Sequence, residues 1–146
     1  MFVDHDLTMS SAVDIDINYL SEDVVNLLLQ SVISVAKPLH QCQFVKMNGT
    51  LYYRNMYVAL DVVDDTPIFG KINAIYVQNL QAVLLLQKYT SEYVSHFSAY
   101  IVHDTDELAV CSIDQLLDYP LTVYLVGQQK MVVLKNFLYN RTQFDY

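Results

Sequence analysis

The chain has 146 residues, which corresponds to a single domain. Apolar residues make up 53% of it and charged residues only 16%, against about 25% charged in a typical soluble domain, so we expect another chain to cover part of the surface. The net charge of −8 and the lack of any Lys/Arg cluster argue against direct binding of nucleic acid. No apolar run reaches the roughly 18 residues of a membrane span, and residues 1–10 lack the basic and apolar regions of a signal peptide. We therefore expect an intracellular protein that does not enter the membrane.

The acidity belongs to the N-terminal segment. Residues 1–36 carry six acids and no Lys or Arg, whereas the rest of the chain carries ten acids and eight bases. We expect residues 1–20 to form an acidic, flexible or edge-strand segment, which a basic partner would attract. Within it, Val13–Ile17 alternates apolar and acidic residues. This pattern fits either the first strand of the domain's own sheet or a strand added to a partner.

A helix is predicted over residues 21–36. Ser21 is a good N-cap, Glu22 and Asp23 suit the positive end of the helix dipole, and Pro38 ends the pattern. The apolar residues at helical spacing form a face wide enough to pack on a sheet or on a second copy of the chain. The residues that we expect to serve self-association are Val25, Leu28, Leu29 and Val32.

The remainder, residues 44–138, reads as β-rich. Short apolar runs recur between turn signals such as Asn48-Gly49, and only one long helix is visible. We expect a mainly β fold with one N-terminal helix (α+β), in the form of a small β-barrel or sandwich of about seven strands within one globular domain, residues 21–146. Residues 90–95 are predicted as a turn or a short helical piece, and residues 103–107 as an acidic loop. The predicted strands are residues 44–47, 52–62, 69–77, 83–89, 97–102, 108–113, 121–126 and 131–138.

Four segments carry a resemblance to a known family. They are Pro67–Ile72, Ala99–Val102, Leu117–Tyr124 and Val132–Lys135. With them, residues 53–138 resemble a β-rich module near the C-terminus of proteins that animal transposable elements and their domesticated relatives encode. The resemblance implies an accessory domain of a larger mobile-element-like protein. It implies no chemistry that could be assigned to individual residues.

Tyrosine is the most informative residue type for binding. The chain has twelve tyrosines and no tryptophan, and a tyrosine ring offers a large apolar face with a polar tip. We expect four tyrosines at the surface, where with nearby acids they would line a groove for a basic peptide or cage a methylated lysine. The predicted binding residues are Tyr53, Tyr57, Tyr89, Glu92, Tyr93, Asp104, Asp106 and Glu107.

No catalytic pattern stands out, so the favoured hypothesis is a non-catalytic module that binds a protein partner or itself, without metal or cofactor. The alternative is a small metal-dependent hydrolase that uses His96 or His103 with nearby acids. A further alternative is a reader of basic, histone-like peptides. Cys42 and Cys111 are expected to be free thiols, because disulfides are rare inside cells.

Overall fold

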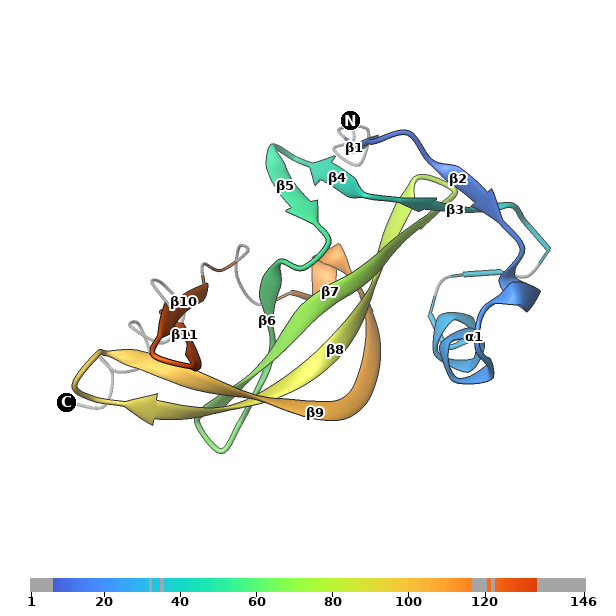
Figure 1. The fold of residues 1–146 in the computed structure, drawn as a ribbon. Helices are drawn as coiled ribbons and strands as arrows, with labels where there is room; N and C mark the ends of the chain where they lie inside the picture. Colours follow the sequence, from blue (N-terminus) through green and yellow to red (C-terminus); the bar gives the residue numbers. More distant parts are fainter. Residues whose placement is uncertain (1–6, 32, 35, 117–120, 122, 134–146) are drawn as a thin grey trace.

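The structure is a computed structural model that describes residues 7–31, 33–34, 36–116, 121 and 123–133 (Figure 1). The described chain forms antiparallel β-strands, one α-helix and two short 3-10 helices. The prediction of a mainly β fold with one N-terminal helix is therefore confirmed. Both sheets are open, so the closed barrel that was considered is wrong for the described residues. No helix in this part of the chain is long and apolar enough to cross a membrane.

The larger sheet has eight strands in the order β10-β11-β9-β8-β7-β3-β2, with β6 also pairing with β7. Its strands are β2 (Val13–Ile15), β3 (Leu39–Cys42), β6 (Tyr57–Val63), β7 (Thr66–Gln78), β8 (Gln81–Val94), β9 (Ala99–Ser112), β10 (Val123–Val126) and β11 (Gln129–Val132). The smaller sheet has the order β1-β4-β5. Its strands are β1 (Leu7–Met9), β4 (Phe44–Met47) and β5 (Thr50–Tyr53).

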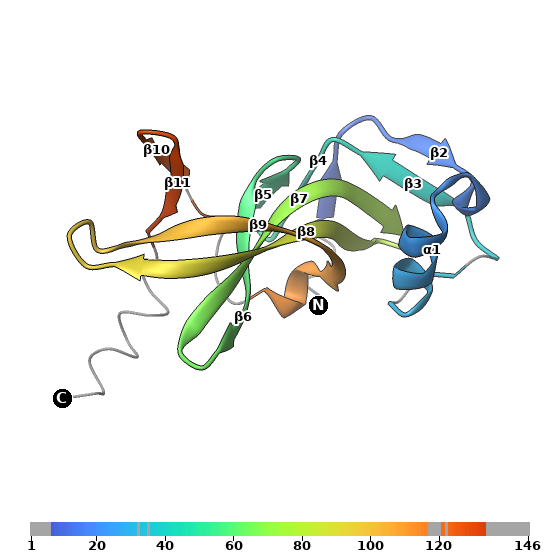
Figure 2. The ribbon, with the colours of Figure 1, turned by 60° about the horizontal axis from the view of Figure 1, so that its bottom comes forward.

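The strands β7, β8 and β9 are 13 to 14 residues long. β7 and β8 contribute residues both to the core under helix α1 (Glu22–Leu29) and to the core near β11. The predicted turn at residues 90–95 falls largely inside β8, and the predicted acidic loop at residues 103–107 lies inside β9. These polar residues continue the pairing of β8 with β9, for example Thr90 with His103 and Glu92 with Ile101. Residues 90–94 lie beyond the last pair of β8 with β7, in the hairpin tip that Figure 2 shows extending past the other strands. Residues 103–107 lie beyond the pairing of β9 with β11, at an irregular part of the β8–β9 pairing, so most of their polar side chains are exposed as in a loop.

The half of the sheet near α1 is covered on both faces. All five residues from Ala82 to Leu86 are buried. Successive side chains of a strand point to opposite faces, so both faces of β8 are covered here. Val83 and Leu85 face the core under α1, whereas Leu84 and Leu86 face the core that Val45 and Tyr52 close. A strand covered on both sides has no polar alternation. The apolar run in the sequence therefore predicted a strand but did not indicate which side chains point to which face of the sheet.

Helix α1 (Glu22–Leu29) is shorter than the predicted helix over residues 21–36. The predicted N-cap is confirmed, since the Ser21 hydroxyl accepts a hydrogen bond from the Val24 N–H at 3.4 Å. The helix ends early because the main chain that follows it forms hydrogen bonds with a side chain of strand β7. The buried side chain of Gln78 accepts from the Ser34 N–H at 2.7 Å and donates to the carbonyls of Ser34 and Lys37 at 2.8 and 3.1 Å.

The N-terminal segment belongs to the fold from residue 7 onward. β1 pairs with β4, and β2 pairs with β3 through Val13 opposite Gln41. The side chain of Asp14 contacts the His40 ring across this pair. Val13–Ile15 is thus a strand of the chain's own sheet, which was one of the two predicted alternatives. Residues 1–6 lie outside the described part.

Candidate binding site

The far end of the large sheet, away from α1, curls around a core of its own. Its buried members include Tyr57, Phe69, Tyr89 and Val132, contributed by β6, β7, β8 and β11. An isolated bridge joins Tyr57 to Leu121, whose N–H donates to the Tyr57 carbonyl at 2.8 Å. The approach to β10 therefore returns to β6, although a single bridge does not close the sheet into a barrel. Figures 1 and 2 both place β10 and β11 at the end opposite α1.

An open pocket of about 290 Å³ lies at this end. It is formed by one residue of β8, four consecutive residues of β9, one residue of the β10–β11 turn and the first two residues of β11. The lining residues are Tyr89, Ile101, Val102, His103, Asp104, Gln128, Gln129 and Lys130. Three of them, Tyr89, His103 and Asp104, are among the residues that the sequence singled out for binding or, in the hydrolase alternative, for catalysis. A concave site with a few convergent polar groups is the usual form of a ligand site.

Two tyrosines and a lysine meet beside this pocket. The rings of Tyr57 and Tyr89 contact edge to face, with 5.3 Å between their centroids. The Lys130 ammonium donates a hydrogen bond to the Tyr57 hydroxyl at 3.3 Å. It lies 5.9 Å from the centroid of the Tyr57 ring and 6.0 Å from that of the Tyr89 ring. Both tyrosine residues are 5% exposed, so the prediction that Tyr57 and Tyr89 reach the surface is wrong.

Asp104 supplies the negative charge of the cluster. It lies directly opposite Tyr89 in the pairing of β8 with β9, and its carboxylate accepts a hydrogen bond from the Gln87 side chain. Burial, the contact with Tyr57 and the charge of Asp104 raise the pKa of Tyr89 to about 12, against the opposing charge of Lys130. Burial also raises the pKa of Tyr57. Both phenols are therefore neutral at physiological pH.

The other predicted binding residues lie around this cluster or away from it. Glu92 and Tyr93 are exposed on the same hairpin, and Glu92 lies 3.7 Å from the His103 ring. Asp106 and Glu107 are exposed at the irregular pairing of β9, where Glu107 lies 3.5 Å from the Lys88 ammonium.

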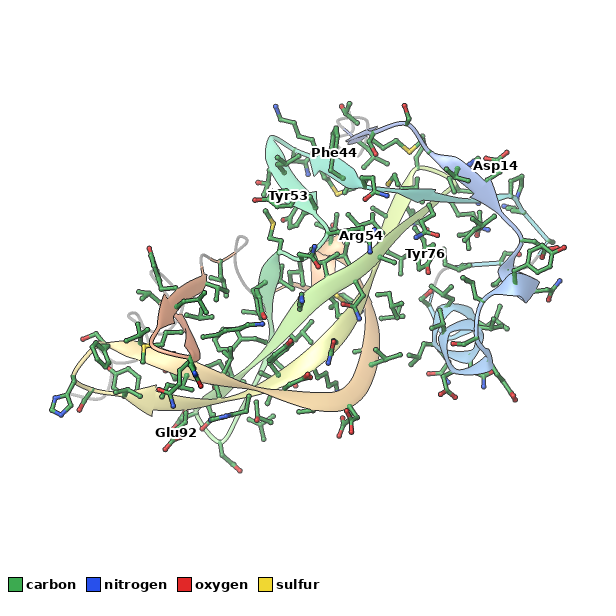
Figure 3. The ribbon with its side chains drawn as sticks, viewed as in Figure 1. Asp14, Phe44, Tyr53, Arg54, Tyr76 and Glu92 are labelled. Atoms are coloured by element: carbon green, nitrogen blue, oxygen red, sulfur yellow. The ribbon has the colours of Figure 1, made fainter. Side chains whose placement is uncertain are left out.

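Tyr53 does not belong to this site. It pairs with Phe44 in the small sheet, and Figure 3 shows both far from Glu92. The sequence placed Tyr53 with the other tyrosines because alternation within a strand does not say which sheet the strand joins.

The sequence missed Lys130, Gln128 and Gln129 as site residues. Lys130 lies 73 positions from the Tyr57 hydroxyl that it contacts. Gly127 lies between two of the predicted strands, residues 121–126 and 131–138, but no local pattern indicates which other strand they join. The pairing of β11 with β9, through Met131 opposite Ile101, brings Lys130 to the pocket.

The helix residues that were predicted for self-association have different surroundings. Leu28 is fully buried in the chain's own core, and Val25 packs against the same core. Leu29 is 44% exposed, and Val32 lies outside the described residues. Of the three described residues, therefore, only Leu29 offers a large exposed surface to a second copy.

The cysteines and histidines were the other candidates for chemistry. Cys42 and Cys111 are free, and burial raises their pKa values to about 11 and about 12, which keeps both as neutral thiols near pH 7. His96 is exposed in the turn between β8 and β9. In the described residues, no three His, Cys, Asp or Glu side chains are grouped as metal ligands would be.

No family model, no curated protein and no solved structure matches this chain.

Proposed function

We propose that this chain is a non-catalytic self-association module, and that a second copy adds to the sheet along β10. The observation that carries the proposal is an apolar, uncharged strand at the edge of the large sheet. β10 has the sequence Val-Tyr-Leu-Val, and the last three side chains are 49%, 72% and 40% exposed. Natural edge strands are usually protected by Lys, Pro, a bulge or a covering element. In the described part of the chain, β10 has no such protection.

The hairpin geometry indicates which backbone groups point outward. Val126 and Gln129 flank the two-residue turn Gly127-Gln128, so they form a hydrogen-bonded pair, and pairing then alternates along the hairpin. The N–H and C=O groups of Val123 and Leu125 consequently point away from β11. The Leu121 N–H, two residues before Val123, donates outward to Tyr57 and so follows the same alternation.

A second copy can match these outward groups. In an antiparallel, two-fold arrangement with Tyr124 opposite Tyr124 of the second copy, each Val123 lies opposite a Leu125. Both Val123–Leu125 pairs then exchange two backbone hydrogen bonds. The same surface serves both copies, as a two-fold interface requires.

The charge distribution also favours a second copy over a charged partner. The whole chain carries −8, but β10 carries no charge, so two copies would meet without like charges at the contact. The exposed Tyr124 and Leu125 side chains lie on opposite faces of the strand. Each face therefore contributes apolar surface that pairing would bury.

Sedimentation velocity over a concentration series tests this proposal. We expect the full chain to sediment as a dimer at high concentration, and Leu125→Lys to sediment as a monomer. Leu125→Pro should have the same effect, because it removes an N–H that points away from β11. The control is Leu80→Lys, which makes the same change at a side chain that is 62% exposed in the turn between β7 and β8.

Two results would refute the proposal. One is a chain that remains monomeric at the highest concentration reached. The other is a dimer that Leu80→Lys disrupts as strongly as Leu125→Lys does. The place of this module in a larger mobile-element-like protein, which the resemblance implies, stays a prediction.

A further inference from the structure

We propose that the cluster of Tyr57, Tyr89 and Asp104 is a binding site for the primary ammonium group of a lysine from another protein, and that in the free chain Lys130 bonds the Tyr57 hydroxyl of this cluster. We call these three residues the ammonium site. The inference goes beyond self-association and does not depend on it.

The three residues present their polar atoms on one face of the curled sheet. Tyr89 lies opposite Phe69 of β7 on one side and opposite Asp104 of β9 on the other. Phe69 in turn lies opposite Ala59, two residues after Tyr57 in β6, so the side chains of Tyr57, Tyr89 and Asp104 share a face. Tyr57 comes from β6, and its ring contacts the Tyr89 ring. Two phenols and one carboxylate thus lie on this face, and Tyr89 and Asp104 also line the pocket.

One oxygen of the ammonium site already bonds an ammonium group in the structure. Lys130 donates to the Tyr57 hydroxyl at 3.3 Å, and its charge also acts on the Tyr89 phenol. An ammonium carries three N–H donors and no acceptor, so a group of oxygens is its natural partner. Bonds between a charged donor and such oxygens are stronger than neutral ones.

The geometry favours a primary ammonium over a methylated one. The ring centroids lie 5.9 and 6.0 Å from the Lys130 ammonium, at the outer limit for attraction of a cation to a ring face. The close contact is to the hydroxyl of Tyr57. A trimethylated lysine has no N–H to donate to that hydroxyl and needs ring faces instead. The proposed site thus differs in its preferred ligand from the methyl-lysine cage that the sequence analysis considered.

An external lysine has a route to the same oxygens. Lys130 is only half-buried and reaches the tyrosines from the hairpin that forms the outer edge of the sheet. The open pocket of about 290 Å³ adjoins Tyr89, Asp104 and Lys130. A lysine side chain of another protein that enters this pocket would therefore reach the ammonium site from beside Lys130, and would displace the Lys130 ammonium.

The test uses the full chain with Lys130→Met, which removes the ammonium and keeps an unbranched side chain. n-Butylammonium is titrated while the ring resonances of Tyr57 and Tyr89 are followed by NMR. We expect saturable binding at least tenfold tighter than to the unaltered chain, where Lys130 competes at a high effective concentration. Lys130→Met/Asp104→Asn should bind at least tenfold more weakly than Lys130→Met. Tetramethylammonium should also bind Lys130→Met at least tenfold more weakly than n-butylammonium does.

A second arm identifies the source of the ammonium. The peptide acetyl-Gly-Gly-Lys-Gly-Gly-amide is titrated into Lys130→Met in three forms: unmodified, Nε-acetylated and Nε-trimethylated. We expect only the unmodified peptide to perturb both rings strongly. If n-butylammonium binds and this peptide does not, the site takes small amines and the assignment to a protein lysine is wrong.

The proposal is overturned if n-butylammonium leaves the rings of folded Lys130→Met unchanged, or if tetramethylammonium binds equally well. Lys130→Gln provides a second variant in case Lys130→Met is not folded. If neither variant folds, thermal unfolding of the unaltered chain decides. Without n-butylammonium-dependent stabilisation that Asp104→Asn abolishes, the site does not bind an external ammonium.

Discussion

At the scale of single residues, Gln78 is the buried polar side chain on which the connection after α1 depends. Its amide bonds the main chain at Ser34 in both directions, and it also donates to the Lys37 and Pro38 carbonyls. We expect Gln78→Leu to lower the free energy of unfolding by about 2 to 4 kcal/mol, because buried main-chain groups would lose their partners. Urea denaturation measures this change.

Gln81→Leu is the matched control, since Gln81 lies opposite Gln78 in the same hairpin and is exposed. It should change the free energy of unfolding by less than about 0.5 kcal/mol. Equal effects of the two substitutions would show that the hydrogen bonds of Gln78 contribute little.

The buried thiols and phenols predict a loss of stability at alkaline pH. Burial raises the pKa of Cys111 from its usual 9.0 to about 12, and that of Tyr89 from 10.0 to about 12. Above about pH 9 the unfolded chain loses these protons while the folded chain keeps them, so unfolding releases protons. The free energy of unfolding therefore falls as the pH rises from about 9 to about 12.

Urea denaturation at pH 8 and at pH 11 measures this fall. Cys111→Ala removes one of the groups, so the difference between the two pH values should be smaller for this variant than for the unaltered chain. An unchanged difference would mean that the thiol ionises equally in the folded and unfolded states.

At the scale of elements, α1 uses its apolar face to cover the chain's own sheet. Leu28 is 0% exposed between the helix and the sheet, whereas its neighbour Leu29 is 44% exposed. We expect Leu28→Ala to lower the free energy of unfolding by about 3 kcal/mol through lost burial and a cavity. Leu29→Ala should lower it by less than 1 kcal/mol, and urea denaturation distinguishes the two.

The same pair bears on association through the helix. Leu29→Lys should leave the sedimentation of the chain unchanged, because the proposed contact lies on β10. If this substitution instead makes the chain monomeric, the self-association contact lies on the helix and not on β10.

The start of α1 could be predicted from the sequence, but its end could not. Ser21 caps the helix through a contact three residues away, which a local pattern encodes. The chain after the helix is held by Gln78, which is 44 residues from Ser34. For the same reason, the tyrosine-rich composition indicated a binding site, but neither the burial of Tyr89 nor the partner Lys130 could be read from local spacing. Strand alternation defines two faces without saying what covers each.

At the scale of the whole molecule, the acidic N-terminal segment is part of the folded structure. β1 and β2 add to two different sheets, and Ile17 is buried in the core under α1. We therefore expect deletion of residues 1–20 to lower the free energy of unfolding by several kcal/mol, since it removes two strands and apolar contacts. The midpoint of urea denaturation measures this loss.

Asp14→Asn/Asp16→Asn separates the charge of this segment from its strands. An asparagine at position 16 can still accept the hydrogen bond that Asp16 takes from the Asn18 N–H. The midpoint of urea denaturation of this variant should be close to that of the unaltered chain. A truncated chain with an unchanged midpoint would show that β1 and β2 contribute nothing to stability.

The order of β7, β8 and β9 has a consequence for how the molecule assembles during refolding. These three strands follow one another in the chain and lie next to one another in the sheet, so short loop closures are enough to zip them together. The strands β3 and β11 pair with the outer strands of this meander, and β2 and β10 pair with them in turn. We expect the contacts of β3 and β11 with the meander to form after the meander itself. In pulse-labelling hydrogen exchange, we expect the amides of Tyr76 and Leu84, which point into the meander, to become protected before that of Val132, whose N–H points toward β9.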